Sequence, residues 1–174
     1  MRMKKLLVPL AVLLGSAGFL GAAGPSDSRL VKIEVKGLAC PFCAYGLEKR
    51  LKETGAERVK IYVDKGLAEA VYPEKRPLDV DGLKEAVKKG GFTPGAIEVR
   101  ARGSLIEKDG RWGFELAGSG DMFLLKEDEN LKKLLKETKR DSLIRLSAKV
   151  EEVREEGHGE HPPLLAVLSH EILR

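Results

Sequence analysis

The sequence predicts an α+β protein in two parts, a β-α-β-β-α-β unit over residues 29–100 and a small β-barrel unit over residues 101–174. Short runs in which apolar residues alternate have the spacing of half-buried strands, and longer stretches with apolar residues every three or four positions have the spacing of amphipathic helices. Turns rich in glycine separate these runs. A composition of 43% hydrophobic and 33% charged residues is that of a globular chain.

The first unit begins with a strand over residues 29–35, which ends at Gly37. Helical spacing starts at Pro41, and Gly55 ends that helix. Alternating apolar residues from Val59 to Tyr72, interrupted by Asp64-Lys65-Gly66, predict a β-hairpin.

A second helix opens at Asp79 and stops at Gly90-Gly91, and Ile97 to Val99 predict a fourth strand. This order is the split βαβ, or ferredoxin-like, arrangement, in which both helices pack on one face of a four-stranded antiparallel sheet.

The second unit shows a different order of elements. The sequence predicts, in turn, a hairpin from Ser104 to Leu116 about Asp109-Gly110, a strand at Met122–Leu125 after the turn Gly118-Ser119-Gly120, a helix within Glu127–Lys139, and strands at Leu143–Val150 and Leu164–Leu173. Three strands, a helix and two strands are the order of a small OB-like β-barrel, which leaves no free sheet edge. We expect the boundary between the units near Arg100 to Gly103.

The N-terminal residues 1–23 are typical of a secretory signal peptide. A basic start is followed by the uncharged run Leu6 to Gly21, which is short for a membrane span and contains Pro9. We expect cleavage after Ala23, no stable membrane anchor afterwards, and a periplasmic or otherwise extracytoplasmic location.

Charge and side-chain chemistry argue against two classes of function. The formal net charge is +4, of which Arg2, Lys4 and Lys5 supply three, leaving about +1 for residues 24–174. The second unit also carries acidic stretches at 127–129 and 151–156, so we expect no nucleic-acid partner. No Ser/His/Asp set, carboxylate pair or phosphate loop is evident, so we expect no enzyme, no catalytic residues and no organic cofactor.

The stretch GLACPFC, Gly37 to Cys43, holds both cysteines of the chain. A C-x-x-C can serve redox exchange, half of a zinc site, or capture of a soft metal ion by two sulfurs. A disulfide that closes so short a loop gives little stabilisation. The predicted position at the start of a helix favours thiolate, because the helix N-terminus offers free N–H groups and partial positive charge.

Two alternatives to soft-metal binding stay open at this point. A closed zinc site needs four ligands, and the available imidazoles, His158, His161 and His170, all lie in the second unit. Redox exchange fits Cys-Pro-Phe-Cys, but a thioredoxin-like chain has another crossover where this chain has a hairpin. We keep a periplasmic thiol–disulfide exchange protein as the second hypothesis and an adaptor with an idle cysteine pair as the third.

Residues 29–100, with GLACPFC in the first βα loop, resemble the heavy-metal-associated domain of copper chaperones, copper-transporting P-type ATPases and periplasmic mercuric-ion-binding proteins. The resemblance implies that Cys40 and Cys43 are metal ligands for Cu(I), with Hg(II) or Ag(I) as further candidates. It also implies transport, delivery or detoxification, with a metal transporter or another metal-binding protein as a partner.

Four features of this sequence bear on the resemblance. Leu38 stands where the family has Met and keeps the apolar volume under the loop. Phe42 is bulky for its position and could shield the ion or contact a partner. Phe92 is a candidate to pack against the loop or, more simply, a core residue. In the second unit, His158 and His161 of GHGEH either bind metal or belong to a polar loop.

Overall fold

The computed structural model describes residues 28–139, 142–151 and 163–173. The predicted signal peptide, His158 and His161 lie outside these residues. None of the helices in the described ranges is long and apolar enough to cross a membrane.

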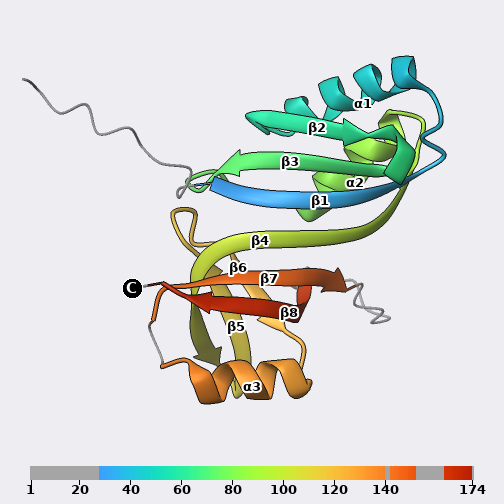
Figure 1. The fold of residues 1–174 in the computed structure, drawn as a ribbon. Helices are drawn as coiled ribbons and strands as arrows, with labels where there is room; N and C mark the ends of the chain where they lie inside the picture. The colour runs from blue at the N-terminus through green and yellow to red at the C-terminus, as the bar shows by residue number, and fades with distance from the viewer. Residues whose placement is uncertain (1–27, 140–141, 152–162, 174) are drawn as a thin grey trace, which may run out of the picture.

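The first unit has the predicted β-α-β-β-α-β order. Its elements are β1 (Ser28–Lys36), α1 (Pro41–Glu53), β2 (Arg58–Tyr62), β3 (Leu67–Pro73), α2 (Val80–Lys89) and the first half of β4 (Thr93–Lys108). The strands lie in the order β2-β3-β1-β4 and every neighbouring pair is antiparallel. Both helices lie side by side over one face of this sheet (Figure 1).

Alternation along the strands places the core between the sheet and the two helices. Residues of β1, β3 and β4 that point to one face are buried, and they pack against the inward faces of α1 and α2; the most buried are Val31, Ile33, Ala68, Ala70, Ile97, Leu47, Leu51, Leu83 and Val87. Asp79 caps α2, since its carboxylate accepts from Gly82 N at 2.8 Å.

The predicted β2–β3 hairpin is present, although its turn begins one residue earlier than the alternation suggested. Val63, Asp64 and Lys65 form a single 3₁₀ turn, and Gly66 takes the left-handed conformation, with φ +56°. Val63 therefore belongs to the turn and not to the strand, because the chain must reverse before β3 can pair with β2.

The prediction of two strands, Ile97–Val99 and one beginning at Ser104, is wrong. Both belong to β4, which is a single strand of 16 residues. Its first half pairs with β1, and its second half pairs with β5 (Arg111–Leu116). Figure 1 shows β4 running from the sheet of the first unit into the barrel, so the predicted boundary near Arg100 falls inside a continuous strand.

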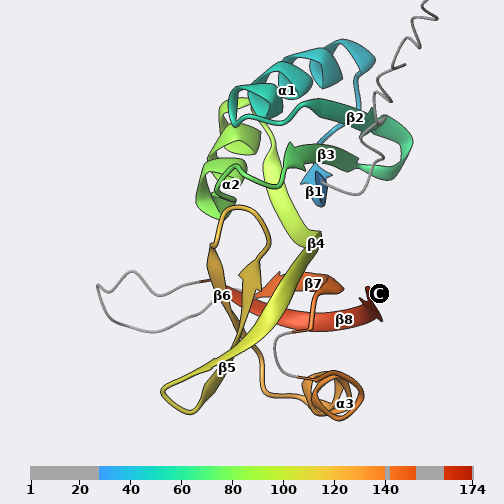
Figure 2. The same cartoon turned by 90° about the vertical axis from the view of Figure 1, so that its left-hand side faces the viewer.

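The second unit is a closed five-stranded barrel. Its further strands are β6 (Met122–Leu125), β7 (Ile144–Glu151) and β8 (Leu164–Ile172). The ring runs β4-β5-β6-β8-β7 and closes through antiparallel pairing of β7 with β4 at residues 98–103. The β6–β8 pair is parallel. Helix α3 (Glu129–Glu137), capped by Asp128, lies at the end of the barrel away from the first unit (Figure 2).

A buried polar junction joins the two units. Arg29 at the start of β1 is 1% exposed and donates to the backbone oxygen of Glu74. The Glu74 carboxylate accepts from Arg102 Nε at 2.6 Å and Nη2 at 2.8 Å. From the barrel, Asp121 Oδ2 lies 3.8 Å from Arg29 Nη1 and accepts from Leu78 N at 2.8 Å. Charged groups from β1, the β3–α2 connection, β4 and the β5–β6 turn therefore meet at one buried point.

Candidate functional site

The cysteine loop, defined as Gly37 to Cys43, connects β1 to α1 at one end of the first sheet. Gly37 has φ +87°, a left-handed conformation that strains residues with a side chain. Cys40 is the N-cap of α1 with extended backbone angles, and its carbonyl oxygen accepts from Ala44 N at 3.2 Å. Cys43 lies in the first helical turn. One sulfur therefore comes from the loop and the other from the helix, as the sequence predicted.

The cysteine loop is held by the hydrophobic core and by two neighbouring segments. Leu38 is 7% exposed and belongs to the hydrophobic core. Just before the loop, Val35 N donates to Gly66 O at 2.7 Å, which holds the β2–β3 turn beside the end of β1. On its other side Val35 pairs with Pro94 of β4. The hydrophobic core, the β2–β3 turn and β4 thus anchor the residues that lead into the cysteines.

Both cysteines are free thiols, with Cys40 partly exposed and Cys43 exposed. Hydrogen bonds from Cys43, through its backbone N–H first and its thiol second, and from the Phe42 backbone lower the pKa of Cys40. The same hydrogen bond to Cys40, followed by partial desolvation and the nearby charge of Cys40, raises the pKa of Cys43. Cys40 therefore loses its proton at a lower pH than Cys43, whose thiol donates to it.

Two aromatic side chains beside the thiols face solvent. Phe42 is 90% exposed and Tyr45 is 76% exposed. Phe42 therefore does not shield the sulfurs in this conformation. Tyr45 was not among the residues predicted for the site, although its place on α1, two positions before the buried Leu47, indicates an outward direction.

Phe92 follows α2, and its backbone N–H donates to Val87 O at 3.2 Å. Its side chain is half-buried and packs against the hydrophobic core. This placement agrees with the simpler interpretation of Phe92 as a core residue. A contact between the Phe92 side chain and the cysteine loop stays a prediction.

A zinc site would need three or more suitable ligands, and the described ranges contain no group of three or more His, Cys, Asp or Glu side chains placed to hold a metal ion. His170 lies on β8 in the barrel, and its Nε2 is 3.0 Å from Glu137 Oε2 of α3. Its imidazole thus has a local structural partner.

No family model matches this chain, and no curated protein matches it. Solved structures resemble about two fifths of it. A copper-binding domain of a P-type ATPase is 20% identical, with a TM-score of 0.35, covering 38% of this chain and 90% of that one. A putative copper-ion-binding protein from Bacillus anthracis is 18% identical, with a TM-score of 0.36, covering 40% and 99%. A heavy-metal-binding protein from Thermotoga maritima is 16% identical, with a TM-score of 0.32, covering 40% and 94%.

Proposed function

We propose that this protein is an exported carrier of a soft metal ion, held between Cys40 Sγ and Cys43 Sγ, with Cu(I) as the preferred ion and Ag(I) or Hg(II) as alternatives. The observation that carries the proposal is the pair of free, solvent-accessible thiols at the N-terminus of α1, with no third ligand group among the described residues. Two sulfurs without further ligands suit soft ions that accept two-coordinate binding.

The loop supports ion capture through its own hydrogen bonds. Hydrogen bonds from Cys43 and, less strongly, from the Phe42 backbone lower the pKa of Cys40, so this sulfur is the first to bind. Cys43 then releases its proton to solvent as its sulfur joins the same ion. The Leu38 anchor limits movement of the loop, so the two sulfurs stay near each other before binding.

Exposed aromatic rings beside the thiols support delivery to a protein partner, either a metal transporter or another metal-binding protein. Phe42 and Tyr45 offer apolar surface next to the bound ion, and aromatic residues are enriched where proteins dock. The domain division at residues 29–100 and 101–174, the signal peptide at 1–23 and a periplasmic location belong to the same proposal. We also propose that the barrel is OB-like, because its strand order includes one parallel pair, β6–β8. We propose that the protein acts without a catalytic step.

A second candidate function is thiol–disulfide exchange. The opposite directions of the two pKa shifts favour it, because a nucleophilic thiolate beside a protonated resolving thiol is the arrangement that exchange uses. In that reaction Cys40 attacks a substrate disulfide, Cys43 attacks the mixed disulfide, and the substrate leaves as a dithiol while Cys40 and Cys43 become a disulfide.

Anaerobic titration of the reduced full chain with Cu(I), in competition with a chromogenic chelator, distinguishes these functions. We expect one Cu(I) per chain, lost in the Cys40→Ser, Cys43→Ser variant and retained in a Phe42→Ala variant. Binding that is weak and unchanged by the double serine variant would contradict the metal proposal. A strongly oxidising reduction potential for the cysteine pair, measured on the same sample, would favour exchange instead.

A further inference from the structure

The end of β1 is tied to the β2–β3 turn by one glycine, Gly66. The backbone N–H of Val35 donates to Gly66 O at 2.7 Å. This bond continues the β1–β3 register, whose last strand pair is Glu34 with Leu67. Val35 is buried, and it stands two residues before the cysteine loop begins at Gly37. The position of the turn therefore bears directly on where the chain enters the loop that carries both thiols.

Gly66 occupies a position that has little room for a side chain. Its φ of +56° lies in the left-handed region, where a residue with a Cβ atom is strained. A Cβ atom built at Gly66 would also lie 3.1 Å from the backbone oxygen of Val35, which is closer than favourable contacts between carbon and oxygen. Backbone angle and space thus both favour glycine here. A side chain at Gly66 would push the turn away from Val35.

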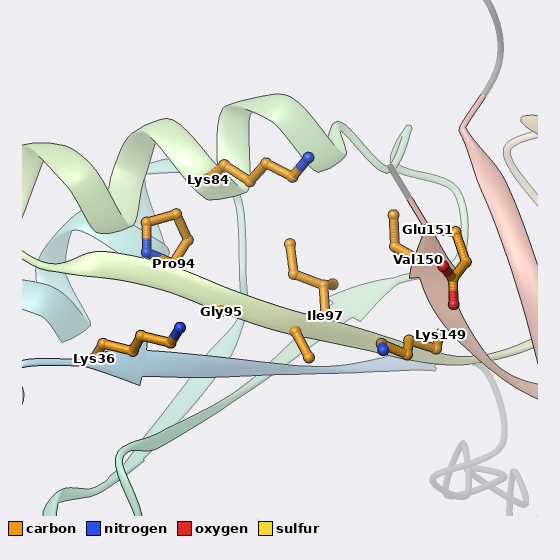
Figure 3. A pocket seen from close by; sticks show the side chains of 9 residues that line it. Lys36, Lys84, Pro94, Gly95, Ile97, Lys149, Val150 and Glu151 are labelled. Carbon is orange, nitrogen blue, oxygen red and sulfur yellow. The ribbon is translucent and has the colours of Figure 1, made fainter. Parts of the chain in front are cut away.

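β4, on the other side of β1, does not replace this contact. Both backbone groups of Val35 face Gly66, the N–H through the hydrogen bond and the oxygen through the close approach, so neither faces β4. The β1–β4 register also shifts between Ile33 and Val35, which interrupts the ladder just before the loop. Figure 3 shows Lys36 at the end of β1 beside the stretch of β4 that contains Pro94. The backbone of Val35 is therefore held from the side of the β2–β3 turn.

The first turn of α1 carries both sulfurs, yet it lacks the polar side chains that usually stabilise a helix start. No side-chain oxygen caps α1, because Cys40 is its N-cap, and its first turn contains no acidic residue. By contrast, α2 is capped by Asp79 and α3 by Asp128. Contacts from elsewhere in the fold must therefore hold the start of α1, and the bond between Val35 and Gly66 is one of them.

We propose that Gly66 is a positioning residue for the metal site, which acts through Val35 to hold the cysteine loop in its binding conformation. The inference rests on the proposed function, because it concerns ion capture by the same two thiols. A side chain at Gly66 would be accommodated by release of the Val35 hydrogen bond in the metal-free chain, so the loop would populate its binding conformation less. The apparent affinity falls in proportion to that population. Coupling is reciprocal, so a bound ion should in turn strengthen the contact between Val35 and Gly66.

Anaerobic titration of the full chain with Cu(I), against a chromogenic chelator, tests this role. Gly66→Ala should keep one Cu(I) per chain and weaken its affinity by about tenfold. Gly110→Ala is the matched control, because Gly110 also has a left-handed φ of +73° but no neighbouring atom within 4 Å of a built Cβ, and it lies in the β4–β5 turn of the barrel. The affinity of this control should stay within about twofold of that of the original chain. An unchanged affinity in Gly66→Ala, or equal losses in both variants, would overturn the proposal.

Hydrogen exchange of the ¹⁵N-labelled original chain tests the same coupling without a variant. Cu(I) binding should slow exchange of the Val35 amide, which donates to Gly66 O, by about tenfold or more. The Ala117 amide, which donates to Arg102 O at 2.9 Å in the second unit, should change by less than about twofold. Equal exchange at Val35 with and without bound Cu(I) would contradict this inference alone. Failure of the original chain to bind Cu(I) through its cysteines would remove the proposed function and this inference together.

Discussion

The two ends of β1 show how one strand serves two opposite environments. At its start, the guanidinium of Arg29 is buried, donates from Nη2 to the backbone oxygen of Glu74, and has Nη1 3.8 Å from Asp121 Oδ2. At its end, two thiols stand open to solvent. The buried end holds the two units together through charges that are costly to leave unpaired. The open end leaves its sulfurs available for a ligand. Stability and binding should therefore respond separately to changes at the two ends.

Arg29→Ala should produce the largest effect, because it leaves Asp121 without its buried cation and opens a cavity at the junction. We expect a loss of about 3–5 kcal/mol in the free energy of unfolding. Chemical denaturation monitored by circular dichroism measures this loss. The Cys40→Ser, Cys43→Ser variant is the control at the other end of β1 and should lose less than about 0.5 kcal/mol. A small loss for Arg29→Ala would show that the junction contributes little.

Leu38→Ala tests whether packing of the cysteine loop on the hydrophobic core contributes to the stability of the protein. Leu38 is nearly inaccessible, so its truncation should cost about 2–4 kcal/mol. Phe42→Ala removes a larger but exposed side chain from the same loop and should change stability by less than about 0.5 kcal/mol. Thermal or denaturant unfolding of the two variants side by side makes the comparison. Similar losses would mean that Phe42 packs against the protein in solution.

The pH dependence of metal affinity should report the difference in pKa between the Cys40 and Cys43 thiols. The pKa of Cys43 is raised, so below that pKa each bound ion must displace its proton. Affinity should fall by about tenfold per pH unit as pH decreases there. Below the lowered pKa of Cys40 a second proton competes, and the fall should approach about a hundredfold per unit.

Competition titrations with Cu(I) across a pH series measure these slopes. Cys43→Ser should abolish the first slope, because the remaining thiolate of Cys40 has no second thiol to deprotonate. An affinity independent of pH in the original chain would contradict ligation by both thiols.

Local sequence patterns were sufficient to predict most helices and strands of the first unit. The alternation of residues 29–35, the helical spacing after Pro41 and the cap at Asp79 depend on neighbours in sequence, and the structure confirms the elements they predict. The arrangement of the cysteines, one in a loop and one in a helical turn, follows from the same local signals. Arg29 also carried a local signal, because it shares the inward-facing alternation of Val31, Ile33 and Val35.

The sequence by itself determined the order of elements and the place of GLACPFC between a strand and a helix, because short-range periodicity and turn chemistry encode both. Only the tertiary structure decided that β4 runs unbroken through the predicted boundary, since its pairing with β1 and β7 joins distant segments. The same holds for the Arg29 junction, because Arg29, Glu74 and Asp121 lie tens of residues apart in the chain and only folding brings them together.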